Sequence, residues 1–199
     1  RMKRTALSFA HDSSSWMRRH VNDPYVKKSQ QAGLRARSAF KLLEIQQKYK
    51  FIKPSSKVLD VGAAPGGWSV VVSQIFSKQT SSNADKVRGW LVCVDLLPID
   101  PITDAVIIQG DFETLSTQKT IEQALGEGEK FDVILSDMLH NATGQRELDH
   151  FKSLDLCQSV LSFSHRFLAP GGSLLCKYYQ GKDEKEWLGQ LREDFGGGK

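Results

Sequence analysis

The chain has 199 residues, of which 40% are hydrophobic and 25% charged, and its net charge is +4. This composition argues against a disordered chain and is typical of a soluble globular protein, while the length favours one domain. No apolar run approaches the roughly 20 residues that cross a membrane, so we expect no membrane partner. The three cysteines form no Cys-x-x-Cys pair. They predict buried free thiols, and they imply neither a metal site nor disulfides.

The first part of the chain, residues 1–34, is expected to be a basic extension of the domain. Across residues 1–37 only Asp12 and Asp23 oppose the basic side chains. Such a segment suits RNA phosphates. The RNA-binding residues expected here are Arg18, Arg19, Lys27, Lys28, Arg35 and Arg37. Residues 1–20 also weakly resemble the end of a mitochondrial presequence, although an RNA-binding arm would have the same composition.

The rest of the chain, residues 35–199, alternates between helical patterns and apolar runs. This order predicts an α/β domain, a mostly parallel sheet with helices on both faces. A helix is expected first, over residues 38–50 with Ser38 as its N-cap, then a strand over 57–61, a helix over 67–77 and a polar loop over 77–86. Strands are then expected over 90–96, 105–109, 131–136 and 173–178, and helices over 117–125, 148–168 and 182–195. The strands are nearly continuous apolar runs, as in sheets buried on both faces.

The segment after the first strand is rich in small residues. It consists of Asp60, Val61, Gly62, Ala63, Ala64, Pro65, Gly66, Gly67 and Trp68. Small residues let a backbone approach a ligand, and a helix N-terminus follows with free N–H groups. The spacing is not G-x-G-x-x-G, which disfavours a nicotinamide cofactor, and no Gly-Lys-Ser/Thr of a phosphate loop follows. A tight turn without a ligand is the alternative.

Two further strands end in acidic residues. Asp95, followed by Leu96, ends the second strand, and an acid there accepts hydrogen bonds from ribose hydroxyls. Asp111 follows the third strand and is expected to meet an adenine amino group, with Phe112 beside the ring. Open α/β sheets bind ligands at the carboxyl ends of their strands. Three such ends in a row therefore predict a cofactor site.

Several segments together resemble the FtsJ/RrmJ family of ribose 2′-O-methyltransferases. The matching segments are residues 37–42, 61–69, 95–98, 109–112, 135–138 and 168–173, the last leading to Cys176-Lys177. They occur in the family's order and span about residues 23–195. The resemblance implies a Rossmann-like methyltransferase fold and S-adenosyl-L-methionine as cofactor. That fold usually has two strands after the last helix found here, so we expect its C-terminal end to be incomplete in this chain.

The resemblance also implies the catalytic residues. The family uses a Lys-Asp-Lys-Glu tetrad, and its first three members map to Lys41, Asp137 and Lys177, with Asp137 also at the cofactor. The glutamate would lie in the absent strands, so no residue is assigned to it. Lys177 is expected to be the general base. Without the resemblance, both lysines would be interpreted as solvated side chains.

The loop after Asp137 departs from the family pattern. It has Leu139-His140 where the family usually has Ala-Pro, but it keeps Asn141, which we expect to contact RNA. His140 and His150 are tempting as bases, yet ribose methylation does not need a histidine, so His140 is interpreted as a loop or substrate contact.

The motif from Asn141 to Cys157 resembles the mitochondrial large-subunit rRNA branch of the family most. It predicts a monomer of the mitochondrial matrix that methylates a uridine, in large-subunit ribosomal RNA, on the assembling large ribosomal subunit. Two alternatives stay open: a ribosome-assembly factor whose binding matters more than its methylation, and a tRNA 2′-O-methyltransferase.

Overall fold

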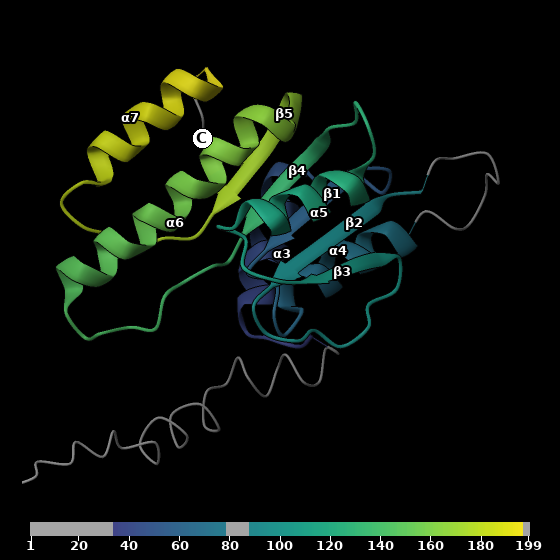
Figure 1. The fold of residues 1–199 in the computed structure, drawn as a ribbon, viewed down its shortest axis with the longest axis horizontal. Coiled ribbons are helices and arrows are strands. Elements are labelled where there is room, and N and C mark those ends of the chain that lie inside the picture. The colour runs from purple at the N-terminus through teal and green to yellow at the C-terminus, as the bar shows by residue number, and fades with distance from the viewer. Residues whose placement is uncertain (1–33, 79–87, 197–199) are drawn as a thin grey trace, which may run out of the picture.

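The computed structural model describes residues 34–78 and 88–196, and within them five parallel strands form one sheet (Figure 1). The strands are β1 (Lys57–Val61), β2 (Trp90–Asp95), β3 (Ala105–Gln109), β4 (Phe131–Ser136) and β5 (Leu168–Cys176). Their order across the sheet is β3-β2-β1-β4-β5, so the chain winds outward from β1 in both directions. The expected mostly parallel α/β fold is confirmed, and β4 and β5 lie beside β1 as neighbours.

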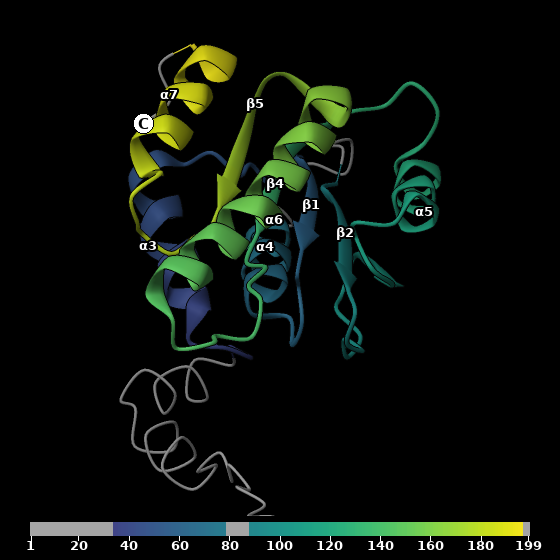
Figure 2. The ribbon, with the colours of Figure 1, turned by 60° about the vertical axis from the view of Figure 1, so that its left-hand side comes forward.

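Helices cover both faces of this sheet (Figure 2). They are α3 (Ser38–Tyr49), α4 (Gly67–Ser77), α5 (Leu115–Leu125), α6 (Arg146–Phe167) and α7 (Glu184–Phe195). Alternate residues of a strand point to opposite faces. Accordingly, Val58 packs in the cluster under α3 and α4, whereas the next residue, Leu59, packs in the cluster under α5 and α6.

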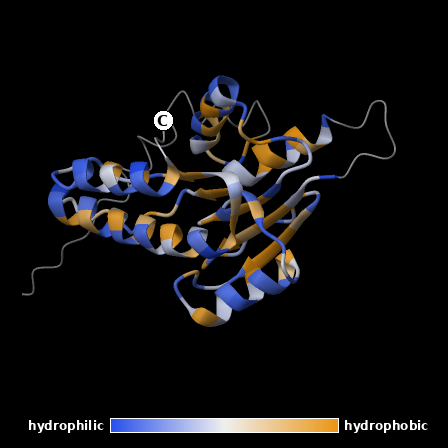
Figure 3. Ribbon diagram, turned by 90° about the horizontal axis from the view of Figure 1, so that it is seen from above, coloured by the Kyte–Doolittle hydropathy of each residue, from blue (hydrophilic) through white to orange (hydrophobic). Residues whose placement is uncertain are grey.

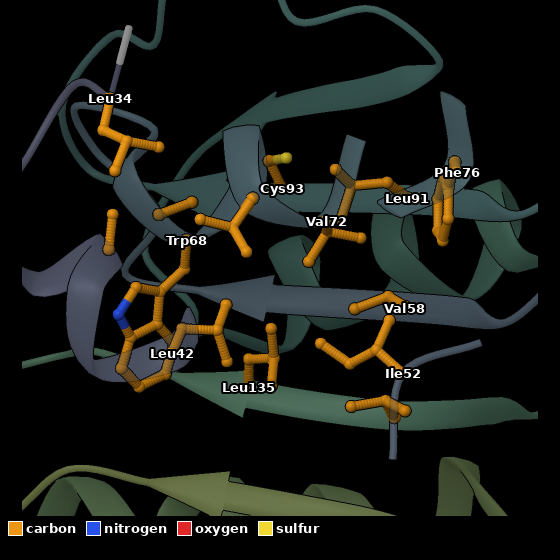
Figure 4. Close-up of a cluster of buried hydrophobic side chains, with 14 residues drawn as sticks. Leu34, Leu42, Ile52, Val58, Trp68, Val72, Phe76, Leu91, Cys93 and Leu135 are labelled. Carbon is orange, nitrogen blue, oxygen red and sulfur yellow. The ribbon is translucent and has the colours of Figure 1, made fainter. Parts of the chain in front are cut away.

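The core consists of apolar clusters on the two faces of the sheet, in the middle of the molecule. Figure 3 shows the hydrophobic strands in the interior and the hydrophilic outer sides of the helices. On the α3 and α4 face, Leu42 and Trp68 pack over β1 and β4 (Figure 4). The indole Nε1 of Trp68 also donates a 3.0 Å hydrogen bond to the carbonyl of Ser38, which joins the two helices.

Some expected helix starts and strand limits are wrong by a few residues. Ser38 is the first helical residue of α3 and not its cap, since the N-cap is Arg37 and no side chain caps it. The helix α5 starts at Leu115, two residues early, because the side chain of Thr114 accepts a hydrogen bond from the Thr117 amide. The last helix, α7, begins at Glu184 rather than residue 182. Ser77 ends α4, and residues 79–86 of the expected polar loop lie outside the described residues.

The strand β5 begins five residues earlier than expected. The Pro-Gly-Gly segment was expected to separate helix from strand, yet it lies within β5. The pairing with β4 jumps from Phe131↔Leu168 to Val133↔Ser173, so the extra residues are accommodated as an irregularity in the ladder.

The last helix, α7, packs beside α6 at the β5 end of the sheet (Figure 1). Trp187 is its one buried residue and contacts the α6 side chains Cys157 and Leu161. A groove of about 610 Å³ runs between β5 and α7. No helix among the described residues has the length and apolar character needed to cross a membrane.

Candidate active site

The carboxyl edge of the sheet brings the ends of β1, β4 and β5 into line. The amide of Asp137 donates to the carbonyl of Val61 (3.1 Å), and the amide of Lys177 donates to that of Ser136 (2.9 Å). The first residue past each strand therefore continues the ladder for one more hydrogen bond. This fixes Asp137 and Lys177 as neighbours, because Ser136 and Cys176 are partners in the register.

The side chains of Asp137 and Lys177 form an ion pair across this edge. The Lys177 Nζ donates to Asp137 Oδ1. The lysine side chain is 39% exposed and the aspartate 16%, so the pair is largely shielded yet reachable from solvent. The expectation that these two residues meet is confirmed. A carboxylate in this place limits the directions in which the lysine amine can point.

The third expected catalytic residue, Lys41, pairs with a different carboxylate. Its Nζ is 3.3 Å from Glu44 Oε2, one turn along α3, and its side chain is 70% exposed. Among the described contacts Lys41 reaches neither Asp137 nor Lys177. The structure thus brings together two of the three expected catalytic residues.

The loop after β1 is fixed by close packing. Gly62 and Gly66 have positive φ angles of 74° and 107°, which favour glycine. A Cβ at Gly62 would lie 2.5 Å from the Cγ of Met138, and one at Gly66 would lie 2.9 Å from Arg35. At both glycines a side chain would therefore meet Met138 or Arg35, so the packing of the protein itself already requires small residues there. The helix α4 begins at Gly67 without a side-chain cap, which leaves amide groups of its first turn available.

Arg35 is part of this packing. Its guanidinium donates to the carbonyls of Asp100 (2.7 Å) and Pro101 (2.8 Å), and at 3.4 Å to that of Pro65. These bonds tie the loop after β2 to the loop after β1. These bonds disfavour the expected contact of Arg35 with RNA phosphates, which stays a prediction, since two of its nitrogens serve backbone carbonyls. The charge pattern of a sequence does not show which arginines donate hydrogen bonds to backbone carbonyls.

Of the other expected RNA-binding residues, the structure describes two and leaves four outside its described part. Arg37 precedes α3 and is exposed, and Asn141 is exposed in the loop after β4. Arg18, Arg19, Lys27 and Lys28 lie outside the described residues, as does most of the expected basic extension.

Asp95 fastens the β1 loop to the end of β2. Its Oδ2 accepts from the amide of Ala64 and its Oδ1 from the amide of Leu97, both at 2.8 Å. The neighbouring Leu96 is 65% exposed, so an apolar surface lies beside this carboxylate. Asp95 is thus a structural residue of the loop as well as a candidate ligand for a cofactor.

Asp60 lies beneath the loop and is fully buried. Its Oδ2 accepts from the hydroxyl of Ser69, which in turn accepts from the Cys93 thiol at 3.2 Å. Its Oδ1 has no hydrogen-bond partner among the described residues. Burial, together with repulsion from Asp137 and Asp95, raises the pKa of Asp60 to about 7.

Three carboxyl groups therefore gather at one place, and Asp60 carries an unused acceptor. A buried acceptor without a partner is costly. A ligand with a positive charge or a hydrogen-bond donor would satisfy that acceptor. The site fits a cationic ligand better than an anionic one.

The third strand end is only partly as expected. Asp111 is exposed and its Oδ1 accepts from the Glu113 amide (2.9 Å). The ring of Phe112, however, is buried and packs edge-on against Phe163, with 5.3 Å between ring centroids. The prediction that Phe112 lies beside a cofactor ring is wrong, because the ring fills the core under α5 and α6.

The loop after β4 is held by a residue that received no role in the sequence analysis. Asp149 in the first turn of α6 accepts from the Thr143 amide and hydroxyl, both at 2.7 Å, and from the Gly144 amide at 3.2 Å. These bonds, led by those from Thr143, lower the pKa of Asp149. A carboxylate in a first helical turn behind a Thr-Gly pair is the signal that would have found it. His140 in this loop is exposed.

A groove of about 420 Å³ opens beside that loop. Its lining residues are Gly144, Arg146, Asp149, Tyr178, Tyr179 and Gln180. Tyr179 is 38% exposed and follows Lys177 by two residues, so the groove lies along the segment that follows the lysine of the ion pair. A basic side chain, Arg146, and an exposed aromatic ring therefore line its walls. No cluster of metal-ligating side chains occurs within residues 34–78 and 88–196.

A doubly wound sheet with a glycine loop after β1, acids at the next strand ends and a lysine–aspartate pair is the architecture of Rossmann-like methyltransferases. The comparison with known families agrees. The chain belongs to the FtsJ-like methyltransferase family, whose sequence model matches residues 34–199.

Similar proteins cover most of the chain. "Ribosomal RNA large subunit methyltransferase E" of Pseudomonas fluorescens is 42% identical over 183 residues, which are 92% of this chain and 83% of the relative. Its namesake in Rickettsia bellii is 43% identical over 183 residues, 92% of this chain and 78% of the relative. The solved structure of a Plasmodium falciparum protein that is named as a ribosomal RNA methyltransferase superposes with a TM-score of 0.71 at 26% identity, covering 80% of this chain and 86% of that one.

Proposed function

We propose that the protein transfers a methyl group from S-adenosyl-L-methionine to a ribose 2′-hydroxyl of large-subunit ribosomal RNA. The observation that carries the proposal is the Lys177–Asp137 pair at the edge of the sheet, next to the buried acidic cluster. Relatives named for methylation of this RNA, at 42% and 43% identity, support the choice of substrate.

The cofactor is proposed from the chemistry of the cluster. S-adenosyl-L-methionine carries an amino group and a sulfonium, so the acids Asp60, Asp95 and Asp137 suit its charge. The unpartnered Oδ1 of Asp60 is an acceptor for a donor on such a ligand. Asp111 and the exposed Leu96 are the residues for the nucleoside part. When bound, the cofactor supplies an electrophilic methyl group.

The residues of the pair then act on the hydroxyl. Lys177 would first have to release its ammonium proton to solvent, because only the neutral amine can accept a proton. Its Nζ would then take the proton of the ribose hydroxyl while the oxygen receives the methyl group and the methyl–sulfur bond breaks, which leaves the neutral thioether as the second product. Asp137 holds that amine in place through its Oδ1. Orientation of this kind and proton transfer are each large contributions to enzyme rates.

The RNA is proposed to enter through the groove beside the loop after β4. Arg146 offers charge to a phosphate, and Tyr179 offers a ring on which an unstacked base can lie. Asn141 in the same loop is a candidate base or ribose contact. The basic residues Arg18, Arg19, Lys27 and Lys28 remain proposed phosphate contacts.

The substrate test is a map of ribose methylation in cells with and without the protein. We expect one large-subunit position, a uridine in our proposal, to lose its methyl group, and purified protein to prefer assembling subunits over naked RNA. If a Lys177→Ala variant restores assembly of the large subunit in cells that lack the protein, the assembly role does not depend on catalysis. Methylation of tRNA with none of rRNA would overturn the assignment.

The mitochondrial matrix is proposed as the location, from the basic and acid-poor residues 1–20 and the motif after Asn141. The protein is further proposed to act as a monomer. Fractionation of cells expressing the full-length protein tests the first proposal, and light scattering of the purified protein tests the second.

A further inference from the structure

The buried face of α6 holds the segment that follows β5, and this segment carries Lys177. Three α6 residues spaced i, i+3 and i+7 contact it, and such spacing puts side chains on one face of a helix. They are His150, Ser153 and Cys157, each about 1% exposed. Two of them contact the backbone of Tyr179 and the third contacts that of Lys177.

Ser153 and His150 form hydrogen bonds with the amide and the carbonyl of Tyr179, respectively. The Ser153 hydroxyl accepts from the Tyr179 amide at 3.0 Å and donates to the His150 carbonyl at 2.8 Å. The His150 Nδ1 meets the Tyr179 carbonyl, which can only accept, so Nδ1 carries the proton. The third residue, Cys157, places its thiol 3.5 Å from the carbonyl of Lys177.

The second ring nitrogen of His150 secures the far end of the same segment. Its Nε2 accepts from the amide of Asp183 at 3.2 Å, which matches the neutral ring with the proton on Nδ1. One buried ring thus joins residues 179 and 183. Gly181 lies between them, and a Cβ there would be 2.3 Å from the ring's Cγ, so the segment lies directly against the imidazole.

Lys177 is therefore fixed from both sides along the chain. Before it, its own amide bonds to Ser136 of β4, and after it, Tyr179 bonds to α6. The lysine side chain is long and flexible, and its reach to Asp137 depends on where its backbone is held. His150 is buried and both of its ring nitrogens bind backbone groups, so we do not expect it to act as a base.

We infer that His150 and Ser153 are positioning residues that hold the backbone of Lys177 in register with Asp137. This inference rests on the proposed function, because it gives these residues their effect on turnover through the lysine. It also assigns a role to His150 and Ser153 within the Asn141–Cys157 motif, which the cofactor and the ion pair leave unexplained.

The sharpest test compares two serines of α6. Ser153 and Ser164 are both buried, and each donates to the carbonyl three residues earlier, at 2.8 Å and 2.7 Å. Only Ser153 also accepts from the Tyr179 amide. Ser153→Ala should reduce kcat by about 10- to 100-fold with an unchanged KM for the cofactor, as small misplacements do. Ser164→Ala should keep the wild-type kcat.

Substitution of His150 by Asn or by Gln tests its two hydrogen bonds separately. Asn in place of His150 keeps a donor near the Nδ1 position, and Gln keeps an acceptor near the Nε2 position. We expect His150→Asn to retain more turnover than His150→Gln, since the Nδ1 contact lies nearer to Lys177. Gly181→Ala, which forces a Cβ against the ring, should lower kcat, whereas Gly189→Ala in α7, with no heavy atom within 4 Å of its Cβ, should not.

Hydrogen exchange supplies a reading that needs neither cofactor nor RNA. In Ser153→Ala the Tyr179 amide should exchange on the order of 5- to 10-fold faster than in the wild type, and in Ser164→Ala it should not. Unchanged exchange and unchanged kcat in Ser153→Ala would overturn the inference, as would equal losses in both serine variants. If the wild-type protein methylates no RNA, the proposed function fails and the role of these residues in turnover fails with it, whatever the exchange rates show.

Discussion

The carboxylate of Asp95 holds the amide of Ala64 at 2.8 Å, so an acid at the end of β2 fixes the loop that follows β1. The same residue is a candidate for the cofactor's ribose. A single substitution of Asp95 should therefore remove both the loop contact and the proposed ribose contact.

For this reason Asp95→Ala should weaken binding of S-adenosyl-L-methionine by about 1.5–3 kcal/mol, the range for lost hydrogen bonds to a charged group. Titration calorimetry measures the change. Asp155→Ala, which removes an exposed acid of α6, should leave the affinity unchanged. Wild-type preference for a nicotinamide dinucleotide would contradict the assignment of this site.

Lys177→Ala should lower the rate of methylation by about 10²- to 10⁴-fold, the span expected for a general base. Cofactor affinity should stay near that of the wild type, since the acids of the cluster remain. Single-turnover assays with saturating cofactor and RNA measure the rate, and Lys119→Ala on α5 is the control for loss of an exposed lysine. Near-normal turnover in Lys177→Ala would show that another group takes the proton.

Asp60 predicts an unusual dependence of stability on pH. Its pKa is about 7 in the folded protein, against an ordinary value of 3.8, so the folded state binds the proton more tightly than the unfolded state. The free energy of unfolding should therefore fall as pH rises from about 4 to about 7 and level off above that. The full effect is on the order of 4 kcal/mol.

Urea unfolding of Asp60→Asn measures this effect. The variant lacks the titration, so its stability relative to the wild type should be greater at pH 8 than at pH 5. Asp155→Asn, at an exposed site, should show no such trend. A wild-type protein that gains on the variant as pH rises would show that Asp60 is charged and stabilised in the fold.

Gly62 offers a test of the loop packing. Gly62→Ala places a methyl group at a φ of 74° and 2.5 Å from Met138, whereas Gly128→Ala has the same φ of 74° and no heavy atom within 4 Å. The second variant should lose about 1–2 kcal/mol from backbone strain alone. Gly62→Ala should lose a further ~1–3 kcal/mol from overpacking. Equal losses in chemical denaturation would mean that Met138 moves aside freely.

A comparison of Arg35 with the basic residues of the N-terminal extension can distinguish a structural arginine from RNA-binding ones. Because its guanidinium serves backbone carbonyls, Arg35→Ala should lower the melting temperature and leave the salt dependence of RNA affinity unchanged. Neutralising Arg18, Arg19, Lys27 and Lys28 together should flatten that dependence. Filter binding at several salt concentrations measures both slopes. A flatter slope in Arg35→Ala would restore it as a phosphate contact.

The sheet order and the meeting of Asp137 with Lys177 were predictable, because parallel strands in this topology end at one edge. Asp137 directly follows its predicted strand, and Lys177 lies at the end of the strand predicted over residues 173–178, which ends two residues earlier, at Cys176. Other roles depended on packing that no local pattern records. Arg35 looked like a phosphate contact, and Phe112 looked like a cofactor contact, until the carbonyls and the core that engage them were known.

For Lys41 and Asp149, by contrast, the spacing of residues in the sequence already indicates the contacts that the structure shows. Glu44 follows Lys41 by three residues, which predicts the ion pair observed on α3. Thr143 and Gly144 precede Asp149 by less than two turns, which is the arrangement of a carboxylate that captures free amides at a helix start.

The ion pair is built from residues that directly follow their strands, with backbone bonds still in register with the ladder. The loop that follows the aspartate is held instead through Thr143 and Gly144, which bind Asp149 at the start of α6. Exchange of this loop for a longer one should therefore leave the backbone spacing of the pair intact only if the Thr-Gly anchor on α6 is kept.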